Sequence, residues 1–279
     1  MYLKVKDHAV SGEEFELVFN ERFGFLETRP CPDESQLHSY YESEDYISHS
    51  DSKRNLFEWI YHLVRIWSVK GKIKLIESFN SKSKNLLDIG CGTGDFLSAA
   101  LKKDWQIVGV EPNDKARAIA NNKTKNAIHT IEVLDHWNQD RFDVITLWHV
   151  LEHLPNLERH IDRFDSLLKP SGTLVVAVPN FKSFDAQWYK NSWAGYDVPR
   201  HLWHFDQTGI RRLFESKGFK IETKIPMKFD AYYVSLLSEK YRTGKMNPFR
   251  AFWIGLKSNL KARSSEEYSS LIYIIKKAD

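Results

Sequence analysis

The chain has 279 residues, of which 42% are hydrophobic, and its 40 lysines and arginines nearly balance its 37 aspartates and glutamates. This balance leaves no basic footprint for a nucleic acid, and two cysteines exclude a disulfide framework. No run approaches the roughly 18 apolar residues of a membrane span, and the N-terminus lacks the apolar core of a signal peptide. We therefore expect no membrane span, no nucleic-acid partner and a cytoplasmic location.

Residues 1–80 are expected to form an N-terminal appendage made of a small hairpin and helices. Two short apolar runs, at 15–19 and 23–26, can pair as the hairpin, and residues 52–79 carry apolar side chains at helical spacing. Cys31 is the only cysteine in this region, so no zinc site can be built from it. Three tyrosines precede the helix: Tyr40, Tyr41 and Tyr46. They fold over a ligand or pack the appendage on the core, and the sequence leaves both interpretations open.

From residue 81 onward, strands and helices alternate. This pattern predicts a second domain, 81–279, of the α/β class, built on a doubly wound parallel sheet with right-handed crossovers. Predicted strands lie at 86–90, 106–111, 127–133, 142–148, 172–178, 219–225 and 269–275. Predicted helices lie at 95–103, 114–122 and 156–168, with one more after Asp206.

Three glycines at alternate positions, Gly90, Gly92 and Gly94, follow the first of these strands, whose last residues include Asp88. Glycines adopt backbone angles that other residues avoid, and they let a ligand approach the main chain. The helix that follows offers unpaired N–H groups and a partial positive charge at its N-terminus. The pattern predicts a nucleotide-type site, with a purely structural glycine turn as the alternative.

The glycine spacing differs from the G-x-G-x-x-G of dinucleotide folds. With Leu86-Leu87-Asp88 before it, the turn resembles motif I of the class I S-adenosylmethionine (SAM) dependent methyltransferases. The resemblance implies an enzyme with a seven-stranded, Rossmann-like, mostly parallel sheet whose antiparallel seventh strand lies between the fifth and the sixth. It also implies SAM as cofactor and S-adenosylhomocysteine as product. The backbone of the turn, Cys91 included, would lie along the amino-acid part of SAM, and Asp88 would belong to the same cofactor site.

Glu111 ends the second strand, and Pro112 begins the turn that follows. In a doubly wound sheet this position places a carboxylate beside the ligand ribose, with a solvated strand-end acid as the alternative. The resemblance assigns Glu111 to the ribose hydroxyls of SAM, with Pro112 beside it. It assigns the loop after the third strand, at Leu134 and Asp135, to the adenine.

Trp148 ends the fourth strand, and the next residues include His149, Glu152 and His153. Their spacing matches the zinc-binding pattern H-x-x-E-H. That pattern needs a helix, whereas this segment leaves a strand inside a sheet, so we expect no metal. The segment resembles the one after strand four in small-molecule methyltransferases. The resemblance implies that Trp148 and His149 contact SAM, His149 near its methionine part, whereas Glu152 and His153 set the loop and begin the next helix.

Residues 180–205 form a loop rich in aromatic residues and histidines, at the sheet edge where such folds bind substrates. Its Pro-Arg-His-Leu-x-His-Phe string resembles one in bacterial methyltransferases near the ubiquinone-biosynthesis O-methyltransferases and sugar C-methyltransferases. We expect His201 or His204 to act as general base for a substrate hydroxyl, and Arg200 to pair with an anionic substrate. Alternatively, one histidine orients the loop through backbone hydrogen bonds. The two histidines are also spaced for a metal, but no third ligand follows.

Residues 227–267 form an aromatic insertion before the last strand, expected to be a substrate lid or a homodimer surface with most of its rings in the core. The Asn/Asp-Pro-Pro-aromatic element common in DNA and RNA amino-methyltransferases is absent after the fourth strand. We therefore expect methyl transfer to a small-molecule acceptor at an oxygen nucleophile. A protein or other macromolecular acceptor, and a SAM-binding module without catalysis, are the alternatives.

Overall fold

The computed structural model describes residues 1–33, 40 and 56–278, and within 56–65 it describes the backbone alone. Tyr41 and Tyr46, two of the three tyrosines predicted to cover a ligand or the core, lie outside the described residues. Among the described residues, no helix combines the length and the apolarity needed to cross a membrane.

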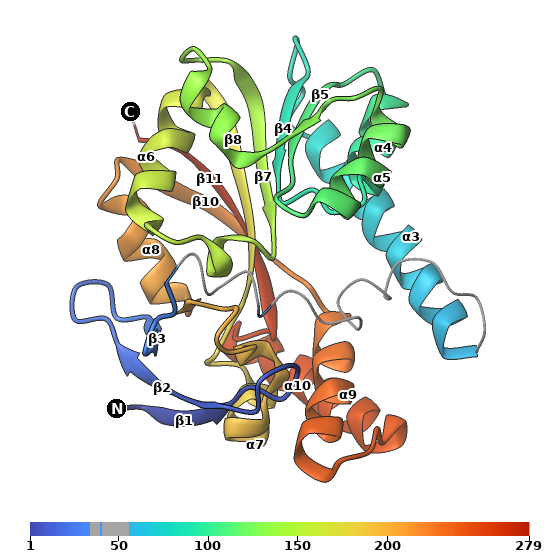
Figure 1. The fold of residues 1–279 in the computed structure, drawn as a ribbon, viewed down its shortest axis with the longest axis vertical. Helices are drawn as coiled ribbons and strands as arrows, with labels where there is room; N and C mark the ends of the chain where they lie inside the picture. Colours follow the sequence, from blue (N-terminus) through green and yellow to red (C-terminus); the bar gives the residue numbers. More distant parts are fainter. Residues whose placement is uncertain (34–39, 41–55, 279) are drawn as a thin grey trace.

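A seven-stranded sheet in the order β10-β11-β8-β7-β4-β5-β6 forms the centre of the molecule (Figure 1). Its strands are β4 (Asn85–Ile89), β5 (Gln106–Val110), β6 (Ile128–His129), β7 (Phe142–Trp148), β8 (Leu168–Pro179), β10 (Phe219–Pro226) and β11 (Ser270–Lys277). Strand β11 runs antiparallel to both of its neighbours, β8 and β10. The predicted mostly parallel sheet, with its last strand between the fifth and the sixth, is confirmed.

The third predicted strand is much shorter than expected. Instead of 127–133, only the two residues of β6 pair, and the chain then forms the 3-10 helix η2 (Ile131–His136). Strand β6 lies at the edge of the sheet and bonds β5 alone. The residues after His129 therefore lack a second strand to hold them extended.

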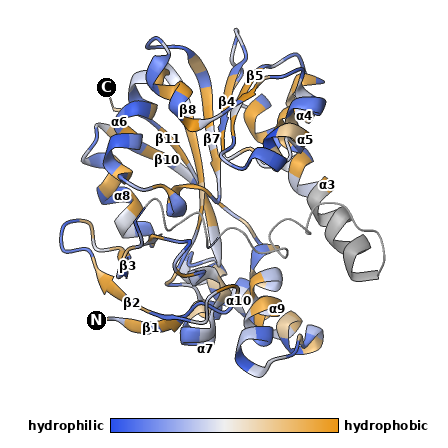
Figure 2. Ribbon diagram, viewed as in Figure 1, coloured by the Kyte–Doolittle hydropathy of each residue, from blue (hydrophilic) through white to orange (hydrophobic). Residues whose placement is uncertain are grey.

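Helices cover both faces of this sheet (Figure 1). One face carries α3 (Leu56–Glu77), α4 (Asp95–Leu101) and α5 (Asp114–Thr124), and the other carries α6 (Leu157–Leu167) and α8 (Gln207–Glu215). Each face has its own buried apolar cluster, and Figure 2 shows the hydrophobic colour running along the central strands between them. This three-layer arrangement leaves the carboxyl edge of the parallel strands for the loops.

A second, smaller sheet joins the N-terminus to the loop 180–205. Strands β1 (Leu3–Lys6), β2 (Glu14–Phe19) and β3 (Leu26–Arg29) are antiparallel, and β3 also pairs with β9 (Trp203–His204). A hairpin forms in this region, but its second strand is Leu26–Arg29 and not the predicted 23–26, of which only Leu26 lies in the strand. Because β9 belongs to the loop, the N-terminal strands hold that loop directly.

The aromatic insertion forms two packed helices, α9 (Asp230–Thr243) and α10 (Pro248–Ser265), beside the short α7 (Phe184–Tyr189). The expectation that most of its rings lie in the core is wrong for five of them, which are exposed: Phe229, Tyr233, Phe249, Phe252 and Trp253. The two helices pack closely at Gly255, since a Cβ there would lie 2.7 Å from the Tyr232 ring and 3.0 Å from the Ala231 carbonyl. This contact leaves no room for a side chain at position 255.

Candidate functional site

The glycine turn follows β4 and is fastened to the next strand. The N–H groups of Gly90 and Cys91 both donate to the Val110 carbonyl, at 2.7 and 3.0 Å. The Cys91 thiol is buried, and burial raises its pKa well above the usual range, so it stays protonated. Gly94 is the N-cap of α4, which places the helix N-terminus directly behind the turn.

The three glycines differ in what surrounds them. A Cβ on Gly90 would lie 2.5 Å from Val150 Cγ2, and one on Gly94 would lie 2.9 Å from Ala120 Cβ, so these two glycines allow close packing. At Gly92, whose φ is +54°, a Cβ would meet no atom of the described residues within 4 Å. Open space beside a bare backbone is what a ligand lying along this turn requires.

Glu111 follows β5 and faces the turn. Its Oε2 accepts the Gly92 N–H at 2.8 Å and its Oε1 accepts the Asn113 N–H at 3.0 Å. Burial raises the pKa of this carboxyl, and the two N–H donors offset part of that rise. Each carboxylate oxygen has more than one lone pair, so both can accept a further hydroxyl proton. The neighbouring Pro112 carbonyl accepts from Arg117 Nη1 at 3.1 Å.

Asp88 points into the sheet. The Thr146 hydroxyl of β7 donates to Asp88 Oδ1 at 2.6 Å, and the residue is only 2% exposed. Burial raises the pKa of Asp88 to about 7, against the lowering effects of Thr146 and Lys72. Asp88 therefore joins β4 to β7 beneath the turn, and near neutral pH it holds a proton in part of the molecules.

Replacing Asp88 by Asn should make the stability of the protein less dependent on pH. Between pH 5 and 7 the folded Asp88 keeps a proton that the unfolded chain has lost, so the wild type loses stability as pH rises. Urea unfolding at pH 5 and pH 8 should show about 2 kcal/mol more loss for the wild type than for Asp88→Asn. Asp143→Asn is the control, because the pKa of Asp143 is lowered and its titration falls below this window. Parallel curves for wild type and Asp88→Asn would contradict the assignment.

Leu134 and Asp135 lie on η2, after the edge strand. The Leu134 carbonyl accepts from Arg163 Nε at 2.7 Å, and the side chain is buried. The Asp135 carboxylate is exposed and forms an ion pair with Arg159 at 3.2 Å. The Leu134 carbonyl is thus already used within the chain, whereas Asp135 stands at the surface, and their assignment to adenine stays a proposal.

Trp148 ends β7 with an unsatisfied donor. Its ring packs edge-on against Phe96, with 5.7 Å between ring centroids, and Lys72 Nζ of α3 lies 4.4 Å from its centroid. The buried indole Nε1 has no hydrogen-bond partner among the described residues. A buried N–H without a partner costs free energy, so this atom suits a bound molecule that supplies an acceptor.

His149 lies between two carboxylates. Its Nε2 is 3.1 Å from Asp230 Oδ2, at the start of α9, and its Nδ1 is 3.4 Å from Glu152 Oε1. Burial favours the neutral ring, but Asp230 and Glu152 outweigh it and raise the pKa of His149 to about 10. His149 is therefore an imidazolium that holds the insertion to the segment after β7. Its predicted place beside the methionine part of SAM stays a proposal.

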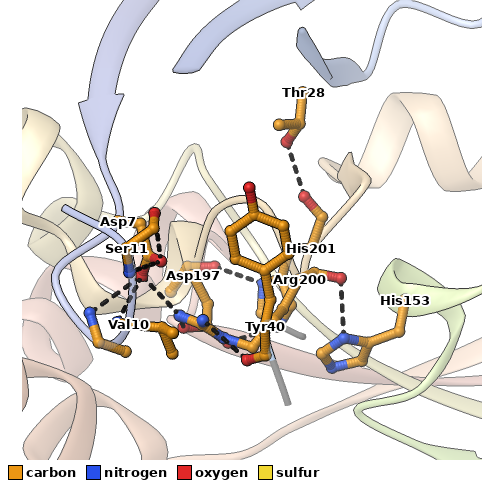
Figure 3. A network of polar contacts seen from close by, with 11 residues as sticks. Asp7, Val10, Ser11, Thr28, Tyr40, His153, Asp197, Arg200 and His201 are labelled. Atoms are coloured by element: carbon orange, nitrogen blue, oxygen red, sulfur yellow. Dashed lines mark hydrogen bonds and ion pairs between the residues drawn. The ribbon is translucent and has the colours of Figure 1, made fainter. Parts of the chain in front are cut away.

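Arg200 is enclosed by partners from its own chain (Figure 3). Its guanidinium donates to Asp197 at 2.6 and 3.0 Å, to Asp7 at 3.2 Å and to the Tyr40 carbonyl at 3.3 Å. The Arg200 side chain is 5% exposed and that of Asp7 is fully buried. The structure thus corrects the expectation of an anionic substrate for Arg200, because two carboxylates of the chain already neutralise it. Tyr40, through its carbonyl and its hydroxyl bond to Glu13, helps pack the appendage.

The rings of His201, in the loop, and His153, after β7, are neighbours, and Figure 3 shows His153 directed at the Arg200 carbonyl of that loop. Their ring centroids are 4.5 Å apart in an edge-on arrangement. His201 Nδ1 is 2.9 Å from the Gly195 carbonyl, and His153 Nδ1 is 3.0 Å from the Arg200 carbonyl. Because a carbonyl oxygen only accepts, Nδ1 carries the proton in each neutral ring and Nε2 carries the lone pair.

His204 is directed away from these two histidines, toward β3. Its Nε2 is 2.9 Å from Thr28 Oγ1, whose own hydroxyl proton goes to the His201 carbonyl at 2.6 Å. His204 Nε2 must therefore be the donor to Thr28. Burial lowers the pKa of His204 well below its usual value, so the ring is neutral. These contacts hold His204 against β3, whereas the backbone hydrogen bond of the orienting alternative is made by His201. Which of the two histidines acts as general base stays a proposal.

The loop 180–205 lies on the segment that follows β7. The Leu202 N–H donates to the Glu152 carbonyl and the Trp203 indole donates to the Leu154 carbonyl, both at 2.8 Å. Within that segment, η3 (Leu151–His153) carries the buried Glu152, which the sequence assigned to loop structure. The loop therefore contacts the same segment that packs against the glycine turn through Val150.

The sheet order, the glycine turn at its carboxyl edge and the acid after β5 define a class I SAM-dependent methyltransferase. Residues 65–224 match the family described as methyltransferase domain. The ubiquinone biosynthesis O-methyltransferase of Coxiella burnetii is 33% identical over 186 residues, which cover 54% of this chain and 79% of the relative. Its counterpart in Rhodopseudomonas palustris is 32% identical over 108 residues, covering 36% and 42%. The chain belongs to the methyltransferase domain family and is an enzyme that uses SAM.

Solved structures agree on the fold. The magnesium protoporphyrin IX methyltransferase of Synechocystis with bound S-adenosylhomocysteine has a TM-score of 0.58 at 14% identity, over 88% of this chain and all of that one. A SAM dependent methyltransferase from Archaeoglobus fulgidus has a TM-score of 0.52 at 19% identity, over 80% of this chain and all of that one. The shared fold extends beyond the region of clear sequence similarity.

Proposed function

We propose that this enzyme methylates a hydroxyl group of a small-molecule acceptor. The observation that carries the proposal is the contact of the histidine-bearing loop with the segment after β7, made beside His201 by the Leu202 N–H on the Glu152 carbonyl. Two relatives bear the name O-methyltransferase, which supports oxygen as the acceptor atom. The nearly balanced charge of the chain adds no support for a nucleic-acid substrate.

The cofactor would lie along the glycine turn. When bound, SAM supplies a methyl group on a sulfonium already activated for transfer. The open backbone at Gly92, the two-sided carboxylate of Glu111 and the unsatisfied Trp148 Nε1 fit a ligand with a polar tail, a ribose and an apolar middle. We assign the Gly92 backbone to the amino-acid part and Glu111 to the ribose hydroxyls. Orientation of the two reactants is the main task of the protein in such a transfer.

His201 is the proposed catalytic histidine on the acceptor side. Its Nδ1 is anchored on the Gly195 carbonyl, so Nε2 holds the lone pair that can take the acceptor's proton. His204 and Arg200 act as positioning residues, because both are bound to β3 or to the turn after β1. They hold the loop that carries His201.

Replacing His201 by Ala should abolish most turnover and spare cofactor binding. General-base catalysis contributes about a hundredfold or more to rate. Calorimetry with S-adenosylhomocysteine tests binding, and release of that product during a screen of phenols and sugar nucleotides tests turnover. His136→Ala is the control, since that histidine is exposed on η2.

Three outcomes would contradict the proposal. The first is a folded protein that does not bind S-adenosylhomocysteine. The second is turnover confined to peptides or to nitrogen or carbon acceptors. The third is a His201→Ala variant with wild-type kcat on a phenol or a sugar hydroxyl.

A further inference from the structure

The segment after β7 and the loop 180–205 bring three potential metal ligands together. One ligand atom each from Glu152, His153 and His201 lies within 4.8 Å of the others. In the sequence, the candidate sets were His149 with Glu152 and His153, or His201 with His204. The fold combines members of both sets: His149 has its ring nitrogens on Asp230 and Glu152, and His204 is bound to Thr28. His201 is the residue that joins Glu152 and His153.

Both histidines are oriented in the manner of metal-binding histidines. Each donates its Nδ1 proton to a backbone carbonyl, Arg200 for His153 and Gly195 for His201. Such a bond fixes the ring and the tautomer and makes the opposite nitrogen, Nε2, the one that binds a metal. The carbonyl partners belong to the same loop, so both rings are set by a single backbone segment.

The Glu152 carboxylate is buried beside these two histidines. Its side chain is 1% exposed, and neither carboxylate oxygen has a hydrogen-bond partner among the described residues. His149 Nδ1 forms an ion pair with Glu152 Oε1, but at the long distance of 3.4 Å. The His149 imidazolium offsets part of the Glu152 charge, but both carboxylate oxygens keep lone pairs without a hydrogen bond, and a metal ion could use them.

We propose that Glu152, His153 and His201 bind a divalent transition-metal cation, with Zn²⁺ the best match. Two imidazoles and one carboxylate form the three-ligand set of catalytic zinc sites, in which the fourth position stays open. Ligand atoms around a tetrahedral zinc lie roughly 3.3 Å apart. Small side-chain rotations that move each ligand atom by about 1 Å would bring the three atoms to this separation. Asp197 Oδ2 lies 4.0 Å from His201 Nε2, which adds negative charge beside the site.

Cation binding would change the chemistry assigned to His201. A bound metal would take the Nε2 lone pair and would lower the pKa of an acceptor hydroxyl at its open position, whose proton would then pass to water instead of to His201. Only this consequence rests on the proposed function, since binding itself needs neither SAM nor an acceptor. The two proposals can therefore fail separately.

The binding test uses the full chain, stripped of metal by a chelator and then titrated calorimetrically with ZnCl₂ in the absence of SAM. We expect one Zn²⁺ to bind per chain. Glu152→Gln and His153→Ala should each weaken binding by at least about a hundredfold, which is more than the loss of a residue that only supports a metal ligand would cause. His136→Ala should bind as the wild type does. All variants should keep their affinity for S-adenosylhomocysteine, which shows that they are folded.

A second measurement needs no variant at the site. Histidine ¹⁵N spectra of the wild type, recorded with and without ZnCl₂, should show the Nε2 signals of His153 and His201 moving, with those of His136 unchanged. CoCl₂ should give the strong visible absorption of a low-coordinate site. No uptake of Zn²⁺ by folded protein, or equal uptake by wild type and His153→Ala, would overturn the proposal even if methyl transfer is confirmed.

Discussion

Replacing Arg200 by Met should lower the free energy of unfolding by about 3–5 kcal/mol, because it leaves the buried carboxylate of Asp7 and the partly buried one of Asp197 without their shared counter-charge. Asp7 and Asp197 both bind the Arg200 guanidinium, and the side chain of Asp7 has no exposed surface. Asp7 also accepts N–H bonds from Ala9 and Ser11, so the turn after β1 depends on its charge. Urea unfolding at pH 7.5 measures the loss.

Two controls separate the buried pair from a general effect of losing an arginine. Arg159→Met removes an exposed partner of Asp135 and should change stability by less than about 0.5 kcal/mol. The combined variant Asp7→Asn, Asp197→Asn, Arg200→Met removes all three charges together and should recover part of the loss, because no charge is left buried and alone.

The alternative for Arg200 predicts a different pattern. If the guanidinium served an anionic acceptor, Arg200→Met would raise KM and leave the unfolding curve nearly unchanged. A loss of stability below about 1 kcal/mol would therefore contradict the structural role of Arg200. It would also mean that the turn after β1 is held to the loop by its backbone contacts.

Local sequence patterns were sufficient for the central sheet. Alternating apolar strands and helices predicted β4, β5, β7 and β11 to within one or two residues, because each is fully covered and its periodicity is undisturbed. The predicted length of β6 was wrong, because residue propensities do not reveal that this strand lies at the edge of the sheet and has only one neighbouring strand. The prediction that most rings of α9 and α10 are buried was wrong for a related reason, because ring exposure depends on how the two helices pack at Gly255.

The candidate site was predictable where it depends on short-range geometry. The glycine turn and Glu111 lie at fixed positions relative to two adjacent parallel strands, and the structure joins them through the Gly92 N–H. The partners of Arg200 and His149 were not predictable, because Asp7 and Asp230 come from distant parts of the chain. Asp197 carried a local hint, since it stands three residues before Arg200.

The roles predicted from the sequence therefore differ most from the structure at buried charged residues and histidines. The sequence offers Arg200, His201 and His204 as equivalent polar residues of one loop, and nothing local ranks them. Packing against β3 and the turn after β1 uses up His204 and Arg200, while His201 faces Glu152 and His153. Long-range contacts therefore decide which loop residue is left for chemistry.

Replacing Glu111 by Ala should weaken S-adenosylhomocysteine binding about ten- to a hundredfold. A hydrogen bond to a charged group contributes about 1.5–3 kcal/mol, which corresponds to this range of affinity. Glu111 also orders the turn, because its Oε2 accepts the Gly92 N–H and its Oε1 accepts the Asn113 N–H. The loss therefore has two sources, the missing ribose contact and a less ordered backbone.

Glu111→Gln separates these two sources. An amide oxygen can still accept one of the backbone N–H bonds, whereas the charge is gone and one ribose hydroxyl would face an amide donor. If the ribose contact dominates, Gln should bind nearly as weakly as Ala, and if the turn dominates, Gln should recover much of the affinity. Glu132→Ala, at an exposed acid on η2, is the control and should bind as the wild type does. Unchanged affinity in Glu111→Ala would remove the ribose assignment.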